Sequence, residues 1–279
     1  MKTIGLIGGL SWESTAVYYK LINEQVREER GGLSSASIVL HSFDFAEIVR
    51  MQQAGQWREA ADALAHAARG LHHCGANCLA ICTNTMHRVA AEVEAAVPRH
   101  VHLIHIGDAV GEAVRRAGYR RVGLLGTRYT MEQPFLAERL QERHGLETVT
   151  PNEEDRGIVH HIIFGELCRG INLPESRRAL GRVTEKLRVE QGAEAVILGC
   201  TELMLSAGEE TGDFPLPRFD TTALHARAIA DYALQSSDSE SIIGESGVST
   251  AVDLRTARIE EKGMKVPCLV PLAPLVRAA

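Results

Sequence analysis

The segment IGLIG at residues 4–8 recurs as VGLLG at residues 122–126, 118 residues further along the chain. A second pair of segments has nearly the same offset: TNTM at 83–86 and CTEL at 200–203 each follow an apolar run that begins just after a Gly-Ala pair. Apolar runs of four to seven residues alternate with longer amphipathic stretches, a pattern typical of βαβ units and parallel sheets. Two matching blocks at nearly equal offsets therefore predict a duplicated α/β fold.

Strands and helices can be placed on this pattern. Ser11 is positioned to cap a first helix, and Glu13 lies in its first turn, where a negative charge is favourable. In the first half we expect strands at 3–7, 37–41, 78–82 and 101–106, and helices at 12–27, 60–71, 83–97 and 108–117. The predicted fold class is α/β, with two similar doubly wound parallel sheets related by a pseudo-two-fold axis. Because open parallel sheets bind ligands beyond the carboxyl ends of their strands, Thr83 and Cys200 should face one cleft from opposite sides.

The same pattern suggests a division into domains. We predict a first α/β domain at 1–117, a second at 118–217, a segment at 218–235 with a helix at 223–234 that packs back on the first domain, and a linker and tail at 236–279. The linker is indicated by its Ser- and Asp-rich composition. No role is assigned to the tail.

Composition excludes several classes of protein. A net charge of −6 and a pI near 6.1 argue against nucleic-acid binding and against a polybasic membrane anchor. The chain has no apolar run near the roughly 18 residues that span a bilayer. Its first residues do not resemble a secretory signal. Six cysteines among 279 residues do not form a dense disulfide framework, so a reducing, cytoplasmic location is expected.

Cys200 is the strongest candidate for chemistry. It follows an apolar run and precedes an apparent helix start, where the helix dipole lowers a thiol pKa and backbone N–H groups can hold a carboxylate. The alternative is a buried cysteine of the core. Thr83, Asn84 and Thr85 are consistent with ordinary helix capping, or with a carboxylate site that includes the N–H of Met86.

Metal and nucleotide sites are not predicted. Cys74, Cys78 and Cys82 have the wrong spacing for a metal knuckle. The glycines after the first strand do not form the G-x-G-x-x-G pattern of dinucleotide sites.

Four segments resemble the aspartate/glutamate racemases, a family of cofactor-independent amino-acid racemases. They are IGLIGGLSWEST at 4–15, CTNTMH at 82–87, GTRYTM at 126–131 and GCTE at 199–202. The resemblance extends from Met1 to about Leu234. It implies an amino-acid substrate, no cofactor, a homodimer, and a two-base mechanism in which opposed groups remove and return the α-proton. The first catalytic cysteine of the family is Thr83 here, as in one branch of the family.

The resemblance also implies roles for individual residues. Thr83 and Cys200 would be catalytic. The substrate contacts would be Ser11, Gln52, Asn84, Thr85, Met86, Thr127, Thr201 and Glu202. Three arginines are candidates to hold a side-chain carboxylate: Arg50, Arg128 and Arg169.

The threonine has a kinetic consequence. Since a hydroxyl is a much weaker acid than a thiol, Cys200 should be the competent base, and exchange should be asymmetric between the enantiomers. Cys82 should point to the opposite face of the sheet from Thr83, so it is not expected to replace it.

Two other functions remain open. A diacid isomerase or decarboxylase of the same fold would rely on one cysteine. It would act on maleate-like or malonate-like substrates, without exchange at an amino-acid α-carbon. A catalytically silent amino-acid binder would bind without exchange and would tolerate Cys200→Ser.

Overall fold

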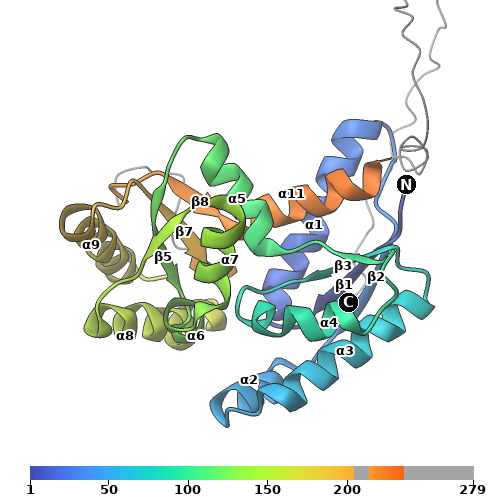
Figure 1. Cartoon of the computed structure of the whole chain (residues 1–279), viewed down its shortest axis with the longest axis horizontal. Coiled ribbons are helices and arrows are strands. Elements are labelled where there is room, and N and C mark those ends of the chain that lie inside the picture. The colour runs from blue at the N-terminus through green and yellow to red at the C-terminus, as the bar shows by residue number, and fades with distance from the viewer. Residues whose placement is uncertain (204–213, 236–279) are drawn as a thin grey trace, which may run out of the picture. The chain divides into compact units, whose positions relative to one another are not determined.

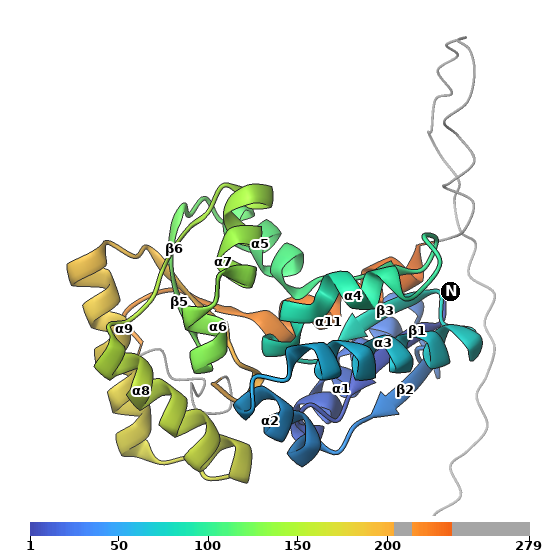
Figure 2. The same cartoon turned by 60° about the horizontal axis from the view of Figure 1, so that its bottom comes forward.

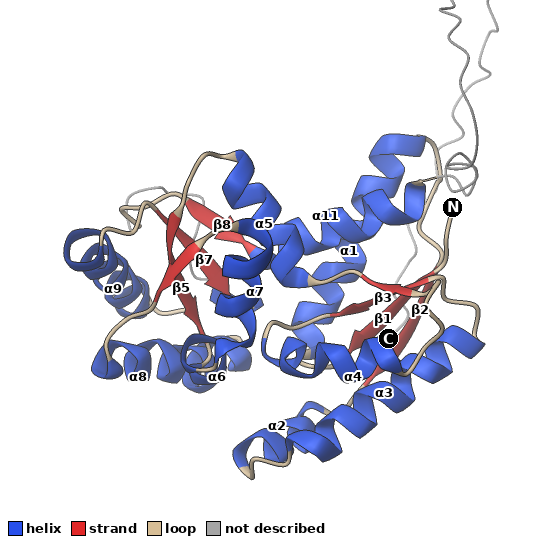
Figure 3. Cartoon of the chain, viewed as in Figure 1, coloured by secondary structure: helices blue, strands red, loops and turns tan. Residues whose placement is uncertain are grey.

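The computed structural model describes residues 1–203 and 214–235, which form two four-stranded parallel sheets flanked by helices (Figures 1 and 3). The strand orders are β2-β1-β3-β4 and β6-β5-β7-β8, so the second sheet repeats the connectivity of the first. The predicted fold class is therefore confirmed. The linker and tail predicted at 236–279 lie outside the described residues.

The first sheet consists of β1 (Ile4–Gly8), β2 (Ile38–Ser42), β3 (Cys78–Ile81) and β4 (His102–Leu103). Its helices are α1 (Trp12–Arg30), α2 (Phe45–Gln53), α3 (Trp57–His73), the 3-10 helix η1 (Thr85–Val89) and α4 (Ala90–Ala95). Side chains alternate across the strands: Ile4 and Leu6 pack in a cluster with α1, whereas Ile7 packs in another with α3. Helices therefore cover both faces of the sheet.

The second sheet consists of β5 (Arg121–Gly126), β6 (Glu147–Val149), β7 (Ala195–Gly199) and β8 (Arg218–Asp220). Its helices are α5 (Ile106–Arg116), α6 (Arg128–Glu132), α7 (Pro134–His144), α8 (Glu153–His161), the π-helical turn η2 (Ile162–Glu166), η3 (Leu167–Arg169) and α9 (Pro174–Gln191). The last described helix, α11 (Thr221–Leu234), follows β8 and packs against both α1 and α5 (Figure 2).

Strand register brings the polar loops together. Ile7 of β1 pairs with Ile81 of β3, and Gly126 of β5 pairs with Gly199 of β7. The segments that follow each pair therefore leave the sheet side by side. Gly9 makes the first of these turns possible: its φ is +71°, and a Cβ there would lie 2.3 Å from the backbone of Phe43.

Two expected elements differ from the structure. The helix predicted at 83–97 is divided into η1 and α4. In an α-helix the Thr83 carbonyl would accept from the His87 N–H, but here it is hydrogen-bonded to the His87 ring at 2.7 Å. That N–H instead donates to Asn84 O at 3.0 Å, which begins a 3-10 turn. The strand predicted at 101–106 is shortened to β4, since His105 already caps α5.

The division at residues 117 and 118 stays a prediction, because residue contacts group Met1–Ser239 as one compact unit that contains both sheets. Among the described helices, none combines the length and apolar character needed to cross a membrane.

Candidate functional site

A narrow cavity lies beyond the carboxyl ends of the central strands of both sheets. Its volume is about 20 Å³, room for about one water molecule. Thr83 lines it just after β3, and Cys200 lines it just after β7. The full lining is Leu10, Phe45, Gln52, Thr83, Thr85, Met86, Thr127, Ile163, Phe164, Cys168, Cys200 and Glu202. The two candidate catalytic residues therefore face one space from equivalent positions of the two sheets.

Most of the predicted substrate-contacting residues also line this cavity. The Gln52 amide donates to the Met86 sulfur at 3.1 Å. The hydroxyls of Thr85 and Thr127 are 2.9 Å apart, a hydrogen bond that joins the loop after β3 to the loop after β5. The cavity is thus bounded by polar contacts between the two sheets.

Three predicted residues do not line the cavity. The Ser11 side chain caps α1 by accepting from the Ser14 N–H. Asn84 donates to the Thr221 hydroxyl at 2.9 Å, and Thr201 donates to Glu202 at 2.6 Å. The side chains of all three support the walls of the cavity and do not line it.

Glu202 is the centre of the polar network at the cavity. Its carboxylate accepts from the Cys200 thiol at 2.9 Å and from the Ser14 hydroxyl at 2.9 Å. Burial opposes its ionisation, but hydrogen bonds from Cys200, Thr201 and Ser11 outweigh burial and hold the pKa of Glu202 below its ordinary value. Glu202 is therefore a buried, ionised carboxylate that contacts the candidate base directly.

The expected lowering of the Cys200 pKa is wrong. Burial raises the pKa of this thiol well above its ordinary value, and the negative charge of Glu202 raises it further. A helix N-terminus contributes only about half a unit charge, which does not offset a full negative charge at hydrogen-bond distance together with burial. Cys200 is consequently a protonated thiol that donates to Glu202.

Comparisons with known proteins agree with this arrangement. The sequence profile described as Asp/Glu/hydantoin racemase matches residues 7–229. The chain belongs to this racemase family. It is similar to the crystal structure of a proposed Asp/Glu racemase from Yersinia pestis, with 51% identity, a TM-score of 0.77, and coverage of 84% of this chain and 100% of the other. It is also similar to an aspartate racemase homologue from Pyrococcus horikoshii, with 36% identity, a TM-score of 0.72, and coverage of 84% and 100%.

More distant similarity extends to the fold alone. Glutamate racemase from Francisella tularensis, solved with D-glutamate, shares 14% identity over 83% of this chain and 80% of the other, with a TM-score of 0.60. A curated protein from Pectobacterium carotovorum of uncharacterised function is 30% identical over 43% of this chain and 77% of its own length. Members of the family are racemases, which are isomerases, and the protein is an enzyme of that class.

In this racemase, the first-half cysteine next to Thr83 does not reach the cavity. Cys82 is fully buried in the cluster that packs against α1 and α11. Burial raises the pKa of its thiol. Thr83 is thus the residue at the site, as the alternation of the strand predicts.

Sequence reasoning missed Cys168, which lines the cavity beside Glu202. Burial is the main cause that raises the pKa of Cys168 to about 12, and the charge of Glu202 adds to it. It follows the π-helical turn η2, which supplies two further missed lining residues, Ile163 and Phe164. Single π-helical turns are frequent at functional sites, but no sequence motif indicates this one.

The cations proposed from the sequence do not line the cavity. The Arg50 side chain is 71% exposed and lies 3.9 Å from Glu47. Arg128 pairs with Glu132 at 3.4 Å, and Arg169 is exposed. None of the three lines the space between Thr83 and Cys200.

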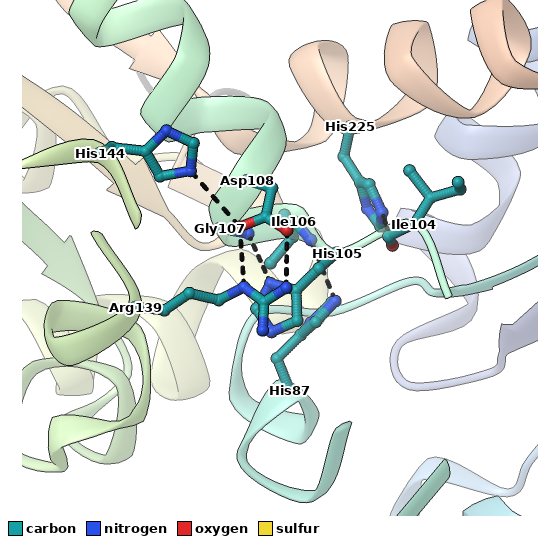
Figure 4. Close-up of polar contacts among 9 residues, drawn as sticks. All are labelled: His87, Ile104, His105, Ile106, Gly107, Asp108, Arg139, His144 and His225. Carbon is teal, nitrogen blue, oxygen red and sulfur yellow. Dashed lines mark hydrogen bonds and ion pairs between the residues drawn. The ribbon is translucent and has the colours of Figure 1, made fainter. Parts of the chain in front are cut away.

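Three buried imidazoles lie where η1, α5 and α11 meet (Figure 4). The ring of His87 lies 4.4 Å from that of His105 and 5.7 Å from that of His225, between centroids. Asp108 borders the cluster and accepts two hydrogen bonds from Arg139, at 2.8 and 2.6 Å. A carbonyl can only accept, so His225 Nε2 carries the proton it donates to Ile104 O at 2.7 Å.

Because of these buried histidines, we expect acid to destabilise the folded state. Burial lowers the pKa of His225 to about 4 and, with Arg139, that of His105 to about 2, whereas an unfolded histidine titrates near 6.5. Below pH 6.5 these histidines therefore bind protons in the unfolded chain but not in the folded one. Stability that is present above pH 6.5 is lost as the pH falls towards these folded values, about 3 kcal/mol at pH 4 from His225 alone.

Urea unfolding at pH 7 and pH 4 measures this loss. His225→Gln, whose amide can still donate to Ile104 O, should reduce the difference between the two pH values, and His102→Gln on the exposed surface should not. An equal pH dependence in the wild type and His225→Gln would contradict the assignment.

Proposed function

We propose that this protein is a cofactor-independent amino-acid racemase that acts on aspartate, glutamate or a related amino acid. The observation that carries the proposal is the placement of Thr83 and Cys200 on one cavity, after equivalent strands of two sheets with the same strand order. Two groups that face a shared space from opposite sides suit removal of an α-proton from one face and its return on the other.

The polar network supports a sequence of proton transfers. Glu202 accepts the Cys200 proton, and the resulting thiolate removes the α-proton of the enantiomer that faces it. The Thr83 hydroxyl, directly or through water, returns a proton to the other face. A proton then passes from Glu202 to Thr83 through water, which restores both groups. Glu202 thereby acts on the thiol, and the sequence-based assignment of Glu202 as a substrate contact is replaced in this proposal.

The backbone after Thr83 supplies a site for the substrate carboxylate. Within the described part of the chain, the N–H groups of Asn84, Thr85 and Met86 donate to no acceptor. Donors of this kind stabilise both a carboxylate and the charge that develops when the α-proton leaves.

The cavity must widen to admit an amino acid. Its present volume of about 20 Å³ accommodates about one water molecule. Hydrogen bonds between the two sheets' loops, from Thr85 to Thr127 and from Ser14 to Glu202, close the space. We propose that the polar groups of the substrate replace some of these contacts.

Isotope exchange tests the function directly. The protein is incubated without cofactor in D₂O with each enantiomer of aspartate, glutamate and homoserine, and α-deuterium and chirality are followed together. Exchange with inversion supports the racemase. Exchange without inversion supports one-sided chemistry at Cys200, and no exchange would favour the diacid enzyme or the silent binder.

Thr83→Cys is expected to raise the rate of inversion about tenfold, because a thiol is a far better acid and base near neutral pH than a hydroxyl. The equilibrium constant between enantiomers stays at one, so kcat/KM must rise equally in both directions. Polarimetry from each enantiomer measures both values. Thr83→Ser, which keeps the hydroxyl, is the matched control, and a Thr83→Cys variant no faster than this control would count against Thr83 as the second acid.

The proposal includes a homodimer in the cytoplasm. The five described cysteines are all free, as expected in a reducing compartment. Trp12 and Tyr19 are 68% and 56% exposed on α1, and they offer an apolar surface to a second copy of the chain.

A further inference from the structure

His87 lies four residues after Thr83, and both of its ring nitrogens are engaged. Nδ1 lies 2.7 Å from the Thr83 carbonyl oxygen. Nε2 lies 3.2 Å from the Ile106 nitrogen at the start of α5, a contact drawn in Figure 4. The residue is 3% exposed. Its ring therefore connects the loop that carries Thr83 to another element of the core.

The partners determine which nitrogen carries the proton. The Thr83 carbonyl can only accept, so Nδ1 donates to it, and the Ile106 N–H can only donate, so Nε2 accepts from it. One neutral tautomer satisfies both partners. The surroundings of the ring favour this neutral form as well. The ring is buried, and His105, His225 and Arg139 oppose a positive charge on it.

Thr83 needs such a constraint because it belongs to no regular element. β3 ends at Ile81 and η1 begins at Thr85. The Thr83 N–H donates to Ile81 O at 2.9 Å, which holds the preceding peptide, and the His87 ring holds the following one. In a trans peptide the C=O and N–H point in opposite directions, so the bond to His87 also turns the Asn84 N–H away from the imidazole.

We infer that His87 is a positioning residue, whose hydrogen bond to the Thr83 carbonyl holds the Thr83 hydroxyl in place for the second proton transfer. The inference rests on the proposed racemase function. It assigns a role to a residue that touches neither the cavity nor the substrate, and it acts on one of the two proton transfers only. Cys200, on the other sheet, keeps its own contacts.

Two substitutions test the two hydrogen bonds of the His87 ring one at a time. An asparagine amide nitrogen falls near the position of Nδ1, so His87→Asn keeps a donor for the Thr83 carbonyl and loses the acceptor for Ile106. A glutamine amide oxygen falls near Nε2, so His87→Gln keeps the acceptor for Ile106 and loses the donor to Thr83. His105→Asn is the matched control, since asparagine also caps α5 and His105 has no bond to Thr83.

The measurement uses the enantiomers of aspartate, glutamate and homoserine in D₂O. It compares inversion, which needs Thr83, with α-deuterium exchange that retains configuration, which needs Cys200 and Glu202 but not Thr83. For His87→Gln we expect inversion to fall about tenfold or more, since small displacements of a reacting group cost rate steeply, while retained exchange stays within about twofold. His87→Asn and His105→Asn should keep the wild-type ratio of inversion to retained exchange.

Equal falls in inversion and retained exchange, or equal losses in His87→Asn and His87→Gln, would overturn the inference. A second measurement places His87→Gln in a Thr83→Ala background, where it should have no further effect on inversion. Wild-type protein that shows no exchange refutes the proposed function itself. Wild-type exchange without inversion leaves the role of Cys200 but refutes the inference, because no Thr83 step then exists to be positioned.

Discussion

Cys200→Ser is expected to reduce inversion and α-deuterium exchange by about a thousandfold, the middle of the range for loss of one general base. A serine hydroxyl at this position would still contact Glu202, but it is so weak an acid that its anion would be too scarce near neutral pH to take an α-proton at a useful rate. Chiral chromatography and deuterium incorporation, measured on the same samples, give both rates.

Two other cysteines make this test specific. Cys74→Ser changes an exposed thiol and should leave both rates unaltered. Cys168→Ser changes the second thiol of the cavity, so it reports whether the cavity requires both sulfurs. If Cys200→Ser retained more than about a tenth of the exchange, the role of Cys200 as the base would be wrong.

Glu202→Gln is expected to lower inversion about a hundredfold and, at the same time, to make Cys200 more reactive towards iodoacetamide near neutral pH. The two effects oppose each other for one reason. The carboxylate raises the pKa of the thiol by its charge, and it is also the group to which the thiol can pass its proton. Its removal should therefore yield a more acidic thiol in a less active enzyme.

Peptide-resolved mass spectrometry of the alkylated protein, over a range of pH, follows Cys200 and Cys168 separately. Glu13→Gln is the matched control, because Glu13 belongs to the same cluster through Ser11 and makes no contact with the Cys200 thiol. A midpoint for alkylation of Cys200 that stays the same or rises in Glu202→Gln would contradict the interpretation of Glu202.

The repeated IGLIG and VGLLG strands illustrate how far periodicity reaches. Each is a short apolar run followed by a turn, and each became the central strand of a sheet with the same strand order. Strand alternation also predicted that Cys82 would not replace Thr83, and Cys82 lies in a core cluster and not in the cavity lining. These predictions succeed because they depend on neighbours within a few residues in the chain.

The helix expected at 83–97 shows where periodicity ends. Its residues are compatible with one helix, but the His87 ring occupies the Thr83 carbonyl that an α-helix would use. The same ring is hydrogen-bonded to Ile106 at the start of α5, 19 residues after His87. A side chain with a partner in another element overrides local propensity here.

The fold class, the duplication and the equivalence of positions 83 and 200 were predictable before folding was considered, since all three follow from short-range patterns and their spacing. Three features appear only in the folded chain: Cys200 is a protonated thiol, Glu202 contacts it, and Cys168 shares its cavity. The protonation state of a group depends on its burial and on the charges and hydrogen bonds within a few ångströms of it. For Cys200, those neighbours include Glu202 and Cys168, and Ser14 of the first half of the chain donates to Glu202 in turn.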